Sequence, residues 1–579
     1  MKNIYYCILF VFLSVKISGQ ALPIVIDGRF EDWKNSEANY TDVNGSGNQI
    51  NLLNFSVSNN EDFLFIRFSA ENEFLLNDNN ELFLEIDTDN DSYTGYYTNG
   101  IGAELRWCFG EREGYFYLFK QSSTIYFSDI RLRALPTVSS SEFEIAIGRD
   151  VKPDGYDLFT NNTIKICFRD YDSNGDLMPD EGDTFSYTFD NNPVTPYQPI
   201  DFEKDDQETV RLLSYNVLSD GISDYERIPS FKRIISAINP DIITFNECWD
   251  TESWVVGDFL NNLLPLAGGA EWQTVKLVNG NITCSKFQIT ESVVVYSNGR
   301  IQASLINLPA NFSKDIVVIN SHFRCCDANY ERQYEADAII DFMLKEKTSS
   351  GVLDLPEGTP MVISGDLNLV GDSQQLTTLI TGEIINTGYF GQGGPPDWDN
   401  SSLEDNVAIQ SDIRMAYTWR RDYSSYWPGR LDFSIFTNSV TEAVKSFVVQ
   451  TEVMPDERLN LYGLQKHDSE IASDHFARVT DFKIKGEQGV NDEINLENKI
   501  NINTLSENNI IEIFLDLKNK SDVVFRIFNI QGKEELQSNP KILSTGKHKL
   551  IRDVSMFKHG IYIIVIEIGK ETYMQKIVI

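Results

Sequence analysis

The sequence is poor in positive charge, and this deficit limits the partners that it can attract. It has 49 Lys and Arg residues against 86 Asp and Glu residues, which gives a formal net charge of −37 and a pI of about 4.5. Broad electrostatic capture of nucleic acid is therefore disfavoured, and the simplest interpretation is a well-solvated surface. A nuclease with a local cationic or metal-filled cleft stays compatible with this charge.

Long apolar runs are also scarce. After the first residues no run reaches about twenty apolar residues, so the sequence predicts no transmembrane helix. At the start, Lys2 precedes a short apolar run over residues 5–15, and the small residues Ser18 and Gly19 follow. This order is typical of a signal peptide, which we predict over residues 1–20. We therefore expect an exported protein.

Cysteine is rare, and no CxxC spacing occurs, which disfavours a thiolate metal site. Cys7 lies in the predicted signal peptide, and an even number remains, which favours disulfides after export. Cys108 could pair with Cys167, and the other four could form two bridges. Adjacent cysteines strain badly if bonded to each other, so we expect Cys325 and Cys326 to have different partners. The remaining cysteines are Cys108, Cys167, Cys248, Cys284, Cys325 and Cys326.

A chain of 579 residues is too long for one core, so we expect three or four domains. Residues 22–190 contain short alternating apolar runs broken by Asn, Asp and Gly, which predicts a β-sandwich. Its opening IVIDGRFEDWKN and its later EIDTDNDSYTGY resemble modules related to family 9 carbohydrate-binding domains. The resemblance implies a binding or positioning module, with a glycan as the candidate ligand. A structural spacer is the alternative.

Two acidic loops lie in this region. Asp87, Asp89 and Asp91 alternate in the first, and DYDSNGDLMPDE in the second has the spacing of a calcium loop of EF-hand type. The flanking segments read as strands, so a true EF-hand is not expected, and a solvated Asp-rich turn is the alternative. The predicted structural Ca²⁺ ligands are Asp170, Asp172, Asn174, Asp176 and Glu181.

Residues 191–209 contain three prolines and a charged run, which predicts a linker. Residues 210–485 then mix buried strands with amphipathic helices, which predicts an α/β fold with stacked sheets. Polar residues recur at the predicted strand ends, where such folds gather a site. In MVISGDLNLV, Gly365 allows a tight turn, and Asp366 and Asn368 can face the same way. Such groups suit a phosphate or metal site.

Other strand ends supply the remaining groups that phosphodiester hydrolysis needs. A divalent ion must polarise the phosphate, and a base must orient the attacking water. The carboxylates of Glu247 and Asp474 suit hard cations, and Asn216 can donate to phosphate oxygens. His322 and His475 are two of only five histidines, and a neighbouring carboxylate would raise the pKa of each. The candidate neighbours are Asp432 and Glu291.

The motifs SYNVL, FNE, NSHF, GDLN, RLDF and SDH, in that order, resemble the endonuclease/exonuclease/phosphatase superfamily, which has the DNase I-like fold. The resemblance implies a two-sheet α/β sandwich with a Mg²⁺-dependent (or Mn²⁺-dependent) site between the sheet edges. By position, Glu247 resembles the principal metal ligand and Asn216 its neighbour at the phosphate. Asp474 resembles a further metal-site carboxylate.

The same resemblance implies the catalytic roles. Asp366 resembles the acid that orients or deprotonates water, and Asn368 resembles the phosphate-binding amide. His475 matches the catalytic histidine held by Asp432. His322 matches the second histidine of members that have a pair, with Glu291 as its carboxylate partner.

Aromatic residues gather near residues 391–429, which we interpret as a substrate-facing loop region that could stack bases or hold lipid or sugar. Packing of a long loop is the alternative. Cys325 and Cys326, just after His322, could cross-link a loop at the cleft rim. The aromatic residues concerned are Trp398, Trp419, Tyr426 and Trp427.

Residues 486–499 read as a second linker, and residues 500–579 as a small β-domain with glycines at its turns. The pattern FRIFNIQGKE…STGKHKL…FKHGIYIIVIEIGKETYMQKIVI resembles the type IX secretion C-terminal sorting domain. It implies recognition by the type IX machinery, removal of the tail, and release or surface attachment. An ordinary accessory β-module is the alternative.

These features together predict a secreted, metal-dependent phosphodiester hydrolase, with a nuclease as the first choice. A lipid or small-molecule phosphodiesterase or phosphatase of the same fold would use the same ligands. A glycan-binding surface protein with an idle catalytic domain is an alternative of another class. We expect a monomer.

Overall fold

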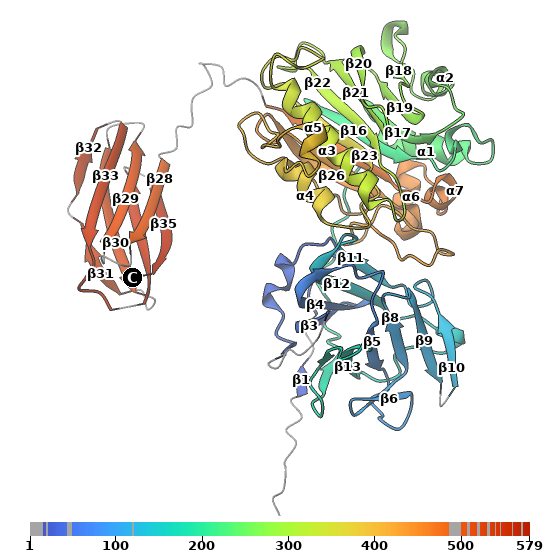
Figure 1. The fold of residues 1–579 in the computed structure, drawn as a ribbon, viewed down its shortest axis with the longest axis vertical. Coiled ribbons are helices and arrows are strands. Elements are labelled where there is room, and N and C mark those ends of the chain that lie inside the picture. Colours follow the sequence, from blue (N-terminus) through green and yellow to red (C-terminus); the bar gives the residue numbers. More distant parts are fainter. Residues whose placement is uncertain are drawn as a thin grey trace, which may run out of the picture. The chain divides into compact units, whose positions relative to one another are not determined.

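The computed structural model describes residues 16–18, 21–42, 49–118, 121–485, 499–505, 510–517, 521–529, 533–538, 540–544, 546–558, 560–568 and 571–578. The chain divides into two compact units, residues 1–486 and 487–579 (Figure 1). Most of the predicted signal peptide and of the second linker lies outside the described residues. Within those residues, no helix has the length and apolarity that crossing a membrane requires.

The N-terminal region is a β-sandwich, as predicted. One sheet has the order β1-β15-β13-β5-β8-β9-β10, with β14 beside β13, and the other has the order β11-β12-β4-β3-β2. Alternating apolar residues from both sheets meet in one core that contains Phe55, Phe68 and Trp107. The strands are β1 (Lys16–Ser18), β2 (Asn39–Thr41), β3 (Leu52–Asn59), β4 (Phe63–Phe74), β5 (Leu82–Asp87), β6 (Tyr96–Thr98), β7 (Ile101–Ala103), β8 (Leu105–Cys108), β9 (Glu113–Leu118), β10 (Gln121–Ile125), β11 (Arg133–Leu135), β12 (Ser140–Gly148), β13 (Thr163–Asp170), β14 (Leu177–Met178) and β15 (Phe185–Thr188).

The central region contains two stacked six-stranded sheets, which confirms the predicted α/β sandwich. Their orders are β18-β19-β17-β16-β27-β26 and β20-β21-β22-β23-β25-β24. The strands are β16 (Thr209–Asn216), β17 (Ile242–Cys248), β18 (Gln273–Val275), β19 (Gly280–Ser285), β20 (Gln288–Tyr296), β21 (Arg300–Asn307), β22 (Ile316–His322), β23 (Met361–Asp366), β24 (Glu404–Asp405), β25 (Asp432–Phe436), β26 (Thr441–Val449) and β27 (Ala477–Ile484).

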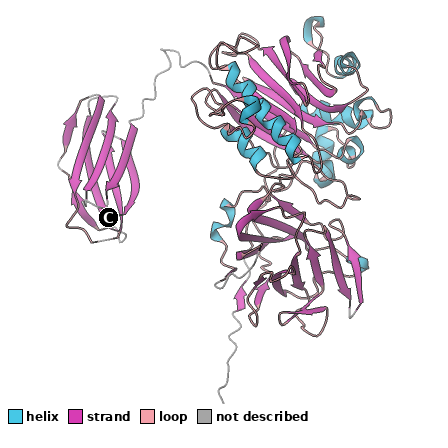
Figure 2. Cartoon of the chain, viewed as in Figure 1, coloured by secondary structure: helices cyan, strands magenta, loops and turns pink. Residues whose placement is uncertain are grey.

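Apolar side chains of the two sheets meet between them, among them Leu212, Val318 and Phe482. Helices cover the outer faces, as Figure 2 shows in cyan. In α1, the predicted apolar face is buried, and the helix ends before Pro240 at Asn239, whose φ is 48°. The helices are α1 (Ile228–Ile238), α2 (Ser253–Leu263), α3 (Asn329–Glu346), α4 (Gln374–Thr381), α5 (Thr387–Phe390), α6 (Asp456–Tyr462) and α7 (Asp468–Ala472).

The sandwich and the central domain form one compact unit, because backbone hydrogen bonds and a common apolar cluster join them. Ile26 exchanges backbone hydrogen bonds with residues 414 and 416 of the central domain, at 3.0 and 2.8 Å. A mixed apolar cluster joins Trp33 and Phe65 of the sandwich to Tyr417 and other central residues. The predicted linker 191–209 also packs against the central domain, where Phe202 is buried.

The C-terminal unit is a small β-domain, as predicted. The sheets β28-β29-β33 and β31-β30-β34-β35, with β32 beside β30, enclose a core that includes Phe525 and Ile564. Its strands are β28 (Lys499–Leu505), β29 (Ile510–Leu517), β30 (Ser521–Asn529), β31 (Glu534–Gln537), β32 (Lys541–Leu543), β33 (Gly546–Asp553), β34 (Ile561–Ile568) and β35 (Glu571–Val578).

The structure corrects the expected disulfides. All six described cysteines are free thiols, and Cys108, Cys167, Cys248 and Cys284 are buried apolar residues of the two cores. Cys325 and Cys326, which we expected to have separate partners, are exposed, and their sulfur atoms lie 2.6 Å apart. Burial raises the pKa of the Cys108 thiol to about 11, so this thiol is an inert core group.

Candidate active site

The site lies at one edge of the two central sheets. Strands β16 and β17 are parallel, as are β22 and β23, so their carboxyl ends meet at the same edge. The antiparallel strand β25 begins there, and Asp432 lies directly opposite Asp366 in the register of β23 and β25. The segment before β27 brings Asp474 and His475 to the same place. The fold thus gathers residues that are up to about 260 positions apart in the sequence.

Asn216 links the carboxylates of Glu247 and Asp366. Its amide nitrogen donates to Glu247 Oε1 at 3.0 Å and to Asp366 Oδ2 at 2.9 Å. Ligand atoms of Glu247, His322 and Asp366 all lie within 4.8 Å of one another. Glu247 has a φ of 61°, which is a strained conformation for this residue type and is common at functional sites.

This donor set fits a divalent cation such as Mg²⁺. Asp474 Oδ1 is buried and has no hydrogen-bond partner among the described residues, and Asp474 lines the same cavity as Glu247. Oxygen atoms are the ligands that Mg²⁺ and Mn²⁺ prefer. Glu247 and Asp474 are therefore the residues that would hold the ion, with Asn216 next to them.

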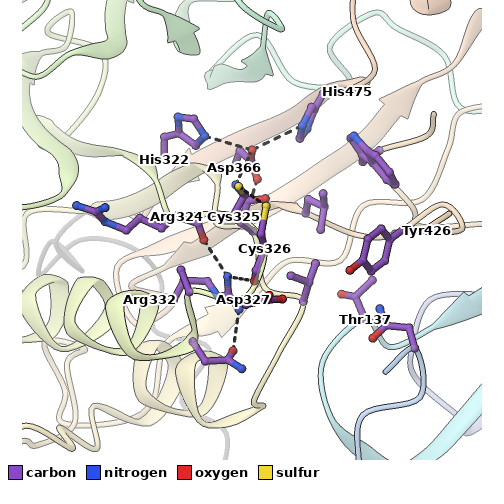
Figure 3. A pocket seen from close by; sticks show the side chains of 18 of the residues that line it. Thr137, His322, Arg324, Cys325, Cys326, Asp327, Arg332, Asp366, Tyr426 and His475 are labelled. Atoms are coloured by element: carbon purple, nitrogen blue, oxygen red, sulfur yellow. Dashed lines mark hydrogen bonds and ion pairs between the residues drawn. The ribbon is translucent and has the colours of Figure 1, made fainter. Parts of the chain in front are cut away.

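Asp366 and His475 form a buried pair. His475 Nε2 lies 3.6 Å from Asp366 Oδ2 (Figure 3). His475 Nδ1 lies 2.9 Å from Asp432 Oδ2. Burial lowers the pKa of His475, but the carboxylates of Asp432 and Asp366 outweigh it and raise the pKa to about 10. Burial raises the pKa of Asp366 to about 7, against the opposing effect of His475.

Asn368 lies beside Asp366, as its place in GDLN predicts. Its amide nitrogen donates to Asp366 Oδ2 at 3.0 Å and to the carbonyl of Phe323 at 3.2 Å. Its φ of 47° turns the chain away from the strand, so the side chain stays at the site edge. Asn246 Oδ1 accepts a hydrogen bond from the Asp366 backbone at 3.0 Å and so positions this acid.

His322 lies on the other side of Asp366, with its Nε2 3.6 Å from Asp366 Oδ2. Its Nδ1 is buried and has no hydrogen-bond partner in the part of the chain that the structure describes. Burial, with Arg300 and His475, lowers the pKa of His322 well below its usual value. The pKa values of the two histidines are therefore shifted in opposite directions, which favours a protonated His475 and a neutral His322.

The structure does not bring Glu291 to His322. Glu291 is exposed on β20, opposite Leu305, which in turn pairs with Val317. Since Val317 is five residues before His322 on β22, Glu291 lies roughly 15 Å along the strand from the histidine. Its position before an apolar run indicated a strand end, but the strand begins earlier, at Gln288.

The predicted calcium loop closes through its own hydrogen bonds. Asp176 Oδ2 accepts from Leu52 N at 2.8 Å, and its Oδ1 accepts from Leu177 N at 2.9 Å. Asp170 Oδ1 accepts from Asp172 N at 3.1 Å. Calcium binding by Asp170, Asp172, Asn174, Asp176 and Glu181 stays a prediction.

A buried polar group that the sequence did not indicate holds the loop after His322. Arg332, on α3, is fully buried and donates to the carbonyls of Arg324 and Cys326 at 2.9 and 2.8 Å. Glu335 accepts from Arg324 N at 3.0 Å, and burial raises its pKa to about 7. The sequence shows Arg332 and Glu335 on a helix with few apolar positions. Charged residues on such a helix are usually exposed to solvent, so their burial was not predicted.

Both domains line the cavity above the site, which has a volume of about 1060 Å³. Trp419, Tyr426 and Trp427 line it, as the substrate-facing interpretation predicts, although Trp427 is only 6% exposed. Trp398 instead donates to the Thr359 carbonyl at 2.7 Å and packs in the central core, as the alternative predicts. In Figure 3, Thr137 of the sandwich and Tyr426 face Cys326 and Asp327 across the cavity.

Several solved structures are similar to this chain at low sequence identity. A structure from Beutenbergia cavernae DSM 12333, described as an endonuclease/exonuclease/phosphatase, is 15% identical and covers 64% of this chain and 100% of its own, with a TM-score of 0.26. Sphingomyelinase C from Streptomyces griseocarneus is 13% identical over 47% of this chain and 99% of its own, with a TM-score of 0.28. A mutant of beta toxin from Staphylococcus aureus with bound magnesium ions is 17% identical over 47% and 99%, with a TM-score of 0.27. No curated protein matches the chain.

Two family models match the chain. The model described as the Endonuclease/Exonuclease/phosphatase family matches residues 213–475. The model described as a secretion system C-terminal sorting domain matches residues 499–579, which indicates export with release or surface attachment. The carbohydrate-binding resemblance of the N-terminal sandwich stays a prediction. Residues 213–475 are thus a domain of the endonuclease/exonuclease/phosphatase family, in a chain that ends in a secretion sorting domain.

Proposed function

We propose that this protein is a secreted, divalent-metal-dependent phosphodiester hydrolase whose site is centred on Asp366. One observation carries the proposal: Asp366 and His475 are 3.6 Å apart, both buried, with pKa values raised to about 7 and about 10. Groups whose environments set such different pKa values are suited to separate acid and base roles. The carboxylates of Glu247 and Asp474 lie beside them.

Each residue then has a role that follows from its contacts. Asp366, held by Asn216 and Asn368, orients the attacking water and accepts its proton through Oδ2. His475, kept protonated by Asp432, donates a hydrogen bond to a phosphoryl oxygen.

The remaining groups bind the phosphate. His322 is neutral and can donate or accept at the opposite side of Asp366. Arg300 donates to the carbonyls of His322 and Phe323 at 3.1 and 2.7 Å, and so positions that histidine. A Mg²⁺ or Mn²⁺ ion held by Glu247 and Asp474 would neutralise phosphate charge and polarise the phosphorus–oxygen bonds.

Within this class we propose a nuclease. Trp419 and Tyr426 supply rings on which bases can stack, and Arg324 and Arg421 supply local positive charge in an otherwise acidic chain. A lipid or small-molecule phosphodiesterase would use the same ligands, so only substrate tests distinguish it from a nuclease. An idle catalytic domain beside a glycan-binding sandwich is disfavoured, because Asn216, Glu247, Asp366, Asn368, Asp474 and His475 are all present and gather at one sheet edge.

The test is hydrolysis of bis(p-nitrophenyl) phosphate and of plasmid DNA by the purified protein with Mg²⁺, with and without EDTA. We expect hydrolysis that EDTA abolishes and that His475→Ala lowers at least about 1000-fold, since this change removes the group that offsets phosphate charge. His467→Ala, which changes an exposed histidine outside the cavity, is the matched control and should retain activity. A diester rate that is the same with His475→Ala, or with EDTA, would refute the proposal.

A further inference from the structure

The N-terminal sandwich forms one side of the catalytic cavity. Leu75, residues 77–79 and Thr137 line the cavity together with catalytic residues such as Asp366. Thr137 Oγ1 donates to the carbonyl of Leu369 at 2.9 Å, directly after Asn368. A substrate bound at Asp366 therefore occupies a cavity whose wall includes this part of the sandwich.

Hydrogen bonds to its backbone carbonyls hold the segment 75–80 in place. Asn80 Nδ2 donates to the carbonyls of Leu75 and Leu76 at 3.0 and 2.8 Å. Arg112 donates to the carbonyl of Asn77 at 2.6 Å, and its guanidinium lies 4.4 Å from the ring centre of Tyr426. Arg112 thus connects the sandwich segment to the aromatic loop of the catalytic domain, and neither side can open without loss of this contact.

The size and chemistry of the cavity limit what can enter. Its volume of about 1060 Å³ is close to that of pockets that enclose small molecules, roughly 300–1,000 Å³. A duplex, whose major groove alone is about 12 Å wide, keeps its bases stacked and must unpair and unstack a nucleotide before it can present the nucleoside to such a pocket. A flexible single strand needs no unpairing, and its bases can leave the stack and lie against aromatic rings.

We propose that the sandwich restricts the site to single-stranded nucleic acid or frayed strand ends. In this arrangement the nucleoside next to the scissile phosphate lies between Tyr426 and the amides of residues 77 and 79, while Arg324 and Arg421 face the strand phosphates. This proposal rests on the proposed nuclease function and specifies its substrate.

The test measures kcat/KM for a single-stranded oligonucleotide, for the same strand in a blunt duplex, and for bis(p-nitrophenyl) phosphate. We expect the single strand to be cleaved at least tenfold faster than the duplex. We expect Asn77→Ala and Tyr426→Ala each to lower the ratio of oligonucleotide to bis(p-nitrophenyl) phosphate activity at least fivefold. Tyr423→Ala, an exposed tyrosine of the same loop that does not line the cavity, should keep the wild-type ratio.

Equal rates on single strand and duplex, or unchanged ratios in both variants, would overturn the role of the sandwich. Absence of bis(p-nitrophenyl) phosphate hydrolysis in the wild-type protein would instead refute the proposed function. Asn77 and Tyr426 are partly exposed, and a melting temperature for each variant separates a folding defect from an effect on substrate choice.

A second, independent observation concerns three acids far from the catalytic residues in the sequence. Ligand oxygens of Asp87, Asp89 and Glu104 all lie within 4.8 Å of one another. Asp87 is fully buried and Glu104 is 8% exposed. Glu104 Oε2 accepts from Thr88 N at 2.8 Å, but its buried Oε1 faces the cluster with no hydrogen-bond partner among the described residues.

The charges of this cluster are not balanced by the side chains around it. Lys165 Nζ lies 3.4 Å from Asp87 Oδ2 and offsets one of three carboxylates. A buried carboxylate oxygen without a donor is costly, and a cation removes that cost. Because all three groups are oxygen donors, a hard divalent cation fits them better than a soft one.

We infer that Asp87, Asp89 and Glu104 bind a structural calcium ion. This site lies in the first acidic loop of the sandwich, whereas the sequence pattern favoured the second. The ion would tie the loop after β5 to the start of β8, and calcium is available to an exported protein.

The test uses the full chain with Glu247→Gln, which removes a catalytic metal ligand. We expect millimolar Ca²⁺ to raise its melting temperature by at least about 3 °C. Adding Glu104→Gln should abolish that shift and remove one bound calcium in equilibrium dialysis. Adding Asp157→Asn, an exposed acid of the sandwich outside both acidic loops, should leave both unchanged. A calcium shift that survives Glu104→Gln, or disappears with Asp157→Asn, would overturn the assignment, as would the absence of any shift.

Discussion

Two β-rich regions flank the catalytic domain in the sequence. The N-terminal region belongs to the same compact unit as the catalytic domain, whereas the C-terminal region forms a unit of its own. The N-terminal sandwich contributes to a mixed apolar cluster with the catalytic domain and to the cavity above the site. The C-terminal domain is a separate compact unit with a core of its own. Composition and strand pattern predict both regions as small accessory modules. What separates them is that the sandwich shares an apolar cluster and a cavity with the catalytic domain within one compact unit.

The clearest shared element is Trp427. It belongs to the catalytic domain by sequence, but it is buried in the sandwich core, with ring centroids 6.4 and 6.2 Å from Trp107 and Phe109. A side chain of this size is stable there only while the sandwich encloses it. The catalytic loop that carries Tyr426 is therefore positioned by the sandwich.

Deletion of either region tests this difference most strongly. Removal of residues 22–190 should leave a catalytic domain that is insoluble or at least about 100-fold less active, because apolar surface is exposed and one side of the cavity is lost. Removal of residues 487–579 should leave activity within about twofold. Both are measured as soluble yield and as kcat/KM on bis(p-nitrophenyl) phosphate. An active, soluble chain without the sandwich would show that the two domains are independent.

Two buried aromatic residues provide a matched pair of substitutions. Trp427→Ala should lower the free energy of unfolding of the first unit by about 3–5 kcal/mol and reduce activity, because the cavity loop loses its anchor. Phe525→Ala, in the core of the C-terminal unit, should destabilise that unit by a similar amount. Urea denaturation and diester hydrolysis measure both effects. Reduced catalysis in Phe525→Ala would contradict the separation of the units.

A pH-dependent effect should be confined to the first unit. Burial raises the pKa of Glu335 to about 7 from an ordinary 4.5, so the folded state holds a proton that the unfolded state has released. Stability should therefore fall as pH rises from about 4.5 to 7, and Glu335→Gln should remove about 3 kcal/mol of that dependence. Urea denaturation at pH 5 and pH 8 measures it. Glu331→Gln, on the exposed face of the same helix, should keep the wild-type dependence.

The smallest expected effect comes from one hydroxyl at the domain boundary. Thr137→Val removes the hydrogen bond to Leu369 and should cost about 1 kcal/mol and a few-fold in kcat/KM, since Leu369 adjoins Asn368. Thr163→Val removes a comparable contact inside the sandwich, 2.8 Å from Thr188 Oγ1, and should affect stability alone. Equal loss of activity in the two variants would show that Thr137 has no special relation to the site.

The sequence predicted the fold and most of the site because those features depend on local pattern. Apolar alternation identified the strands, and Asp366, Asn368, Asp432 and His475 lie together because strand ends of one sheet edge converge. The sandwich surface at Thr137 was not predicted, because contacts between residues more than two hundred positions apart leave no local periodicity.

Two errors have similar physical causes. Glu291 was predicted to be the partner of His322 because it precedes an apolar run. In the strand register it lies roughly five residues away from His322. The cysteines were paired by parity and compartment, yet Cys108 on β8 and Cys167 on β13 lie on opposite sides of β5, and both are free, buried thiols. Register and burial are set by tertiary packing, which a single sequence does not contain.

One measurement tests the central claim that residues up to 485 are the complete catalytic body. It compares kcat/KM for bis(p-nitrophenyl) phosphate, in Mg²⁺ and in EDTA, between the full chain and a chain that ends at Lys485. The account predicts equal, EDTA-sensitive hydrolysis within about twofold. A tenfold loss in the shorter chain, or hydrolysis that does not need metal in either, would contradict it.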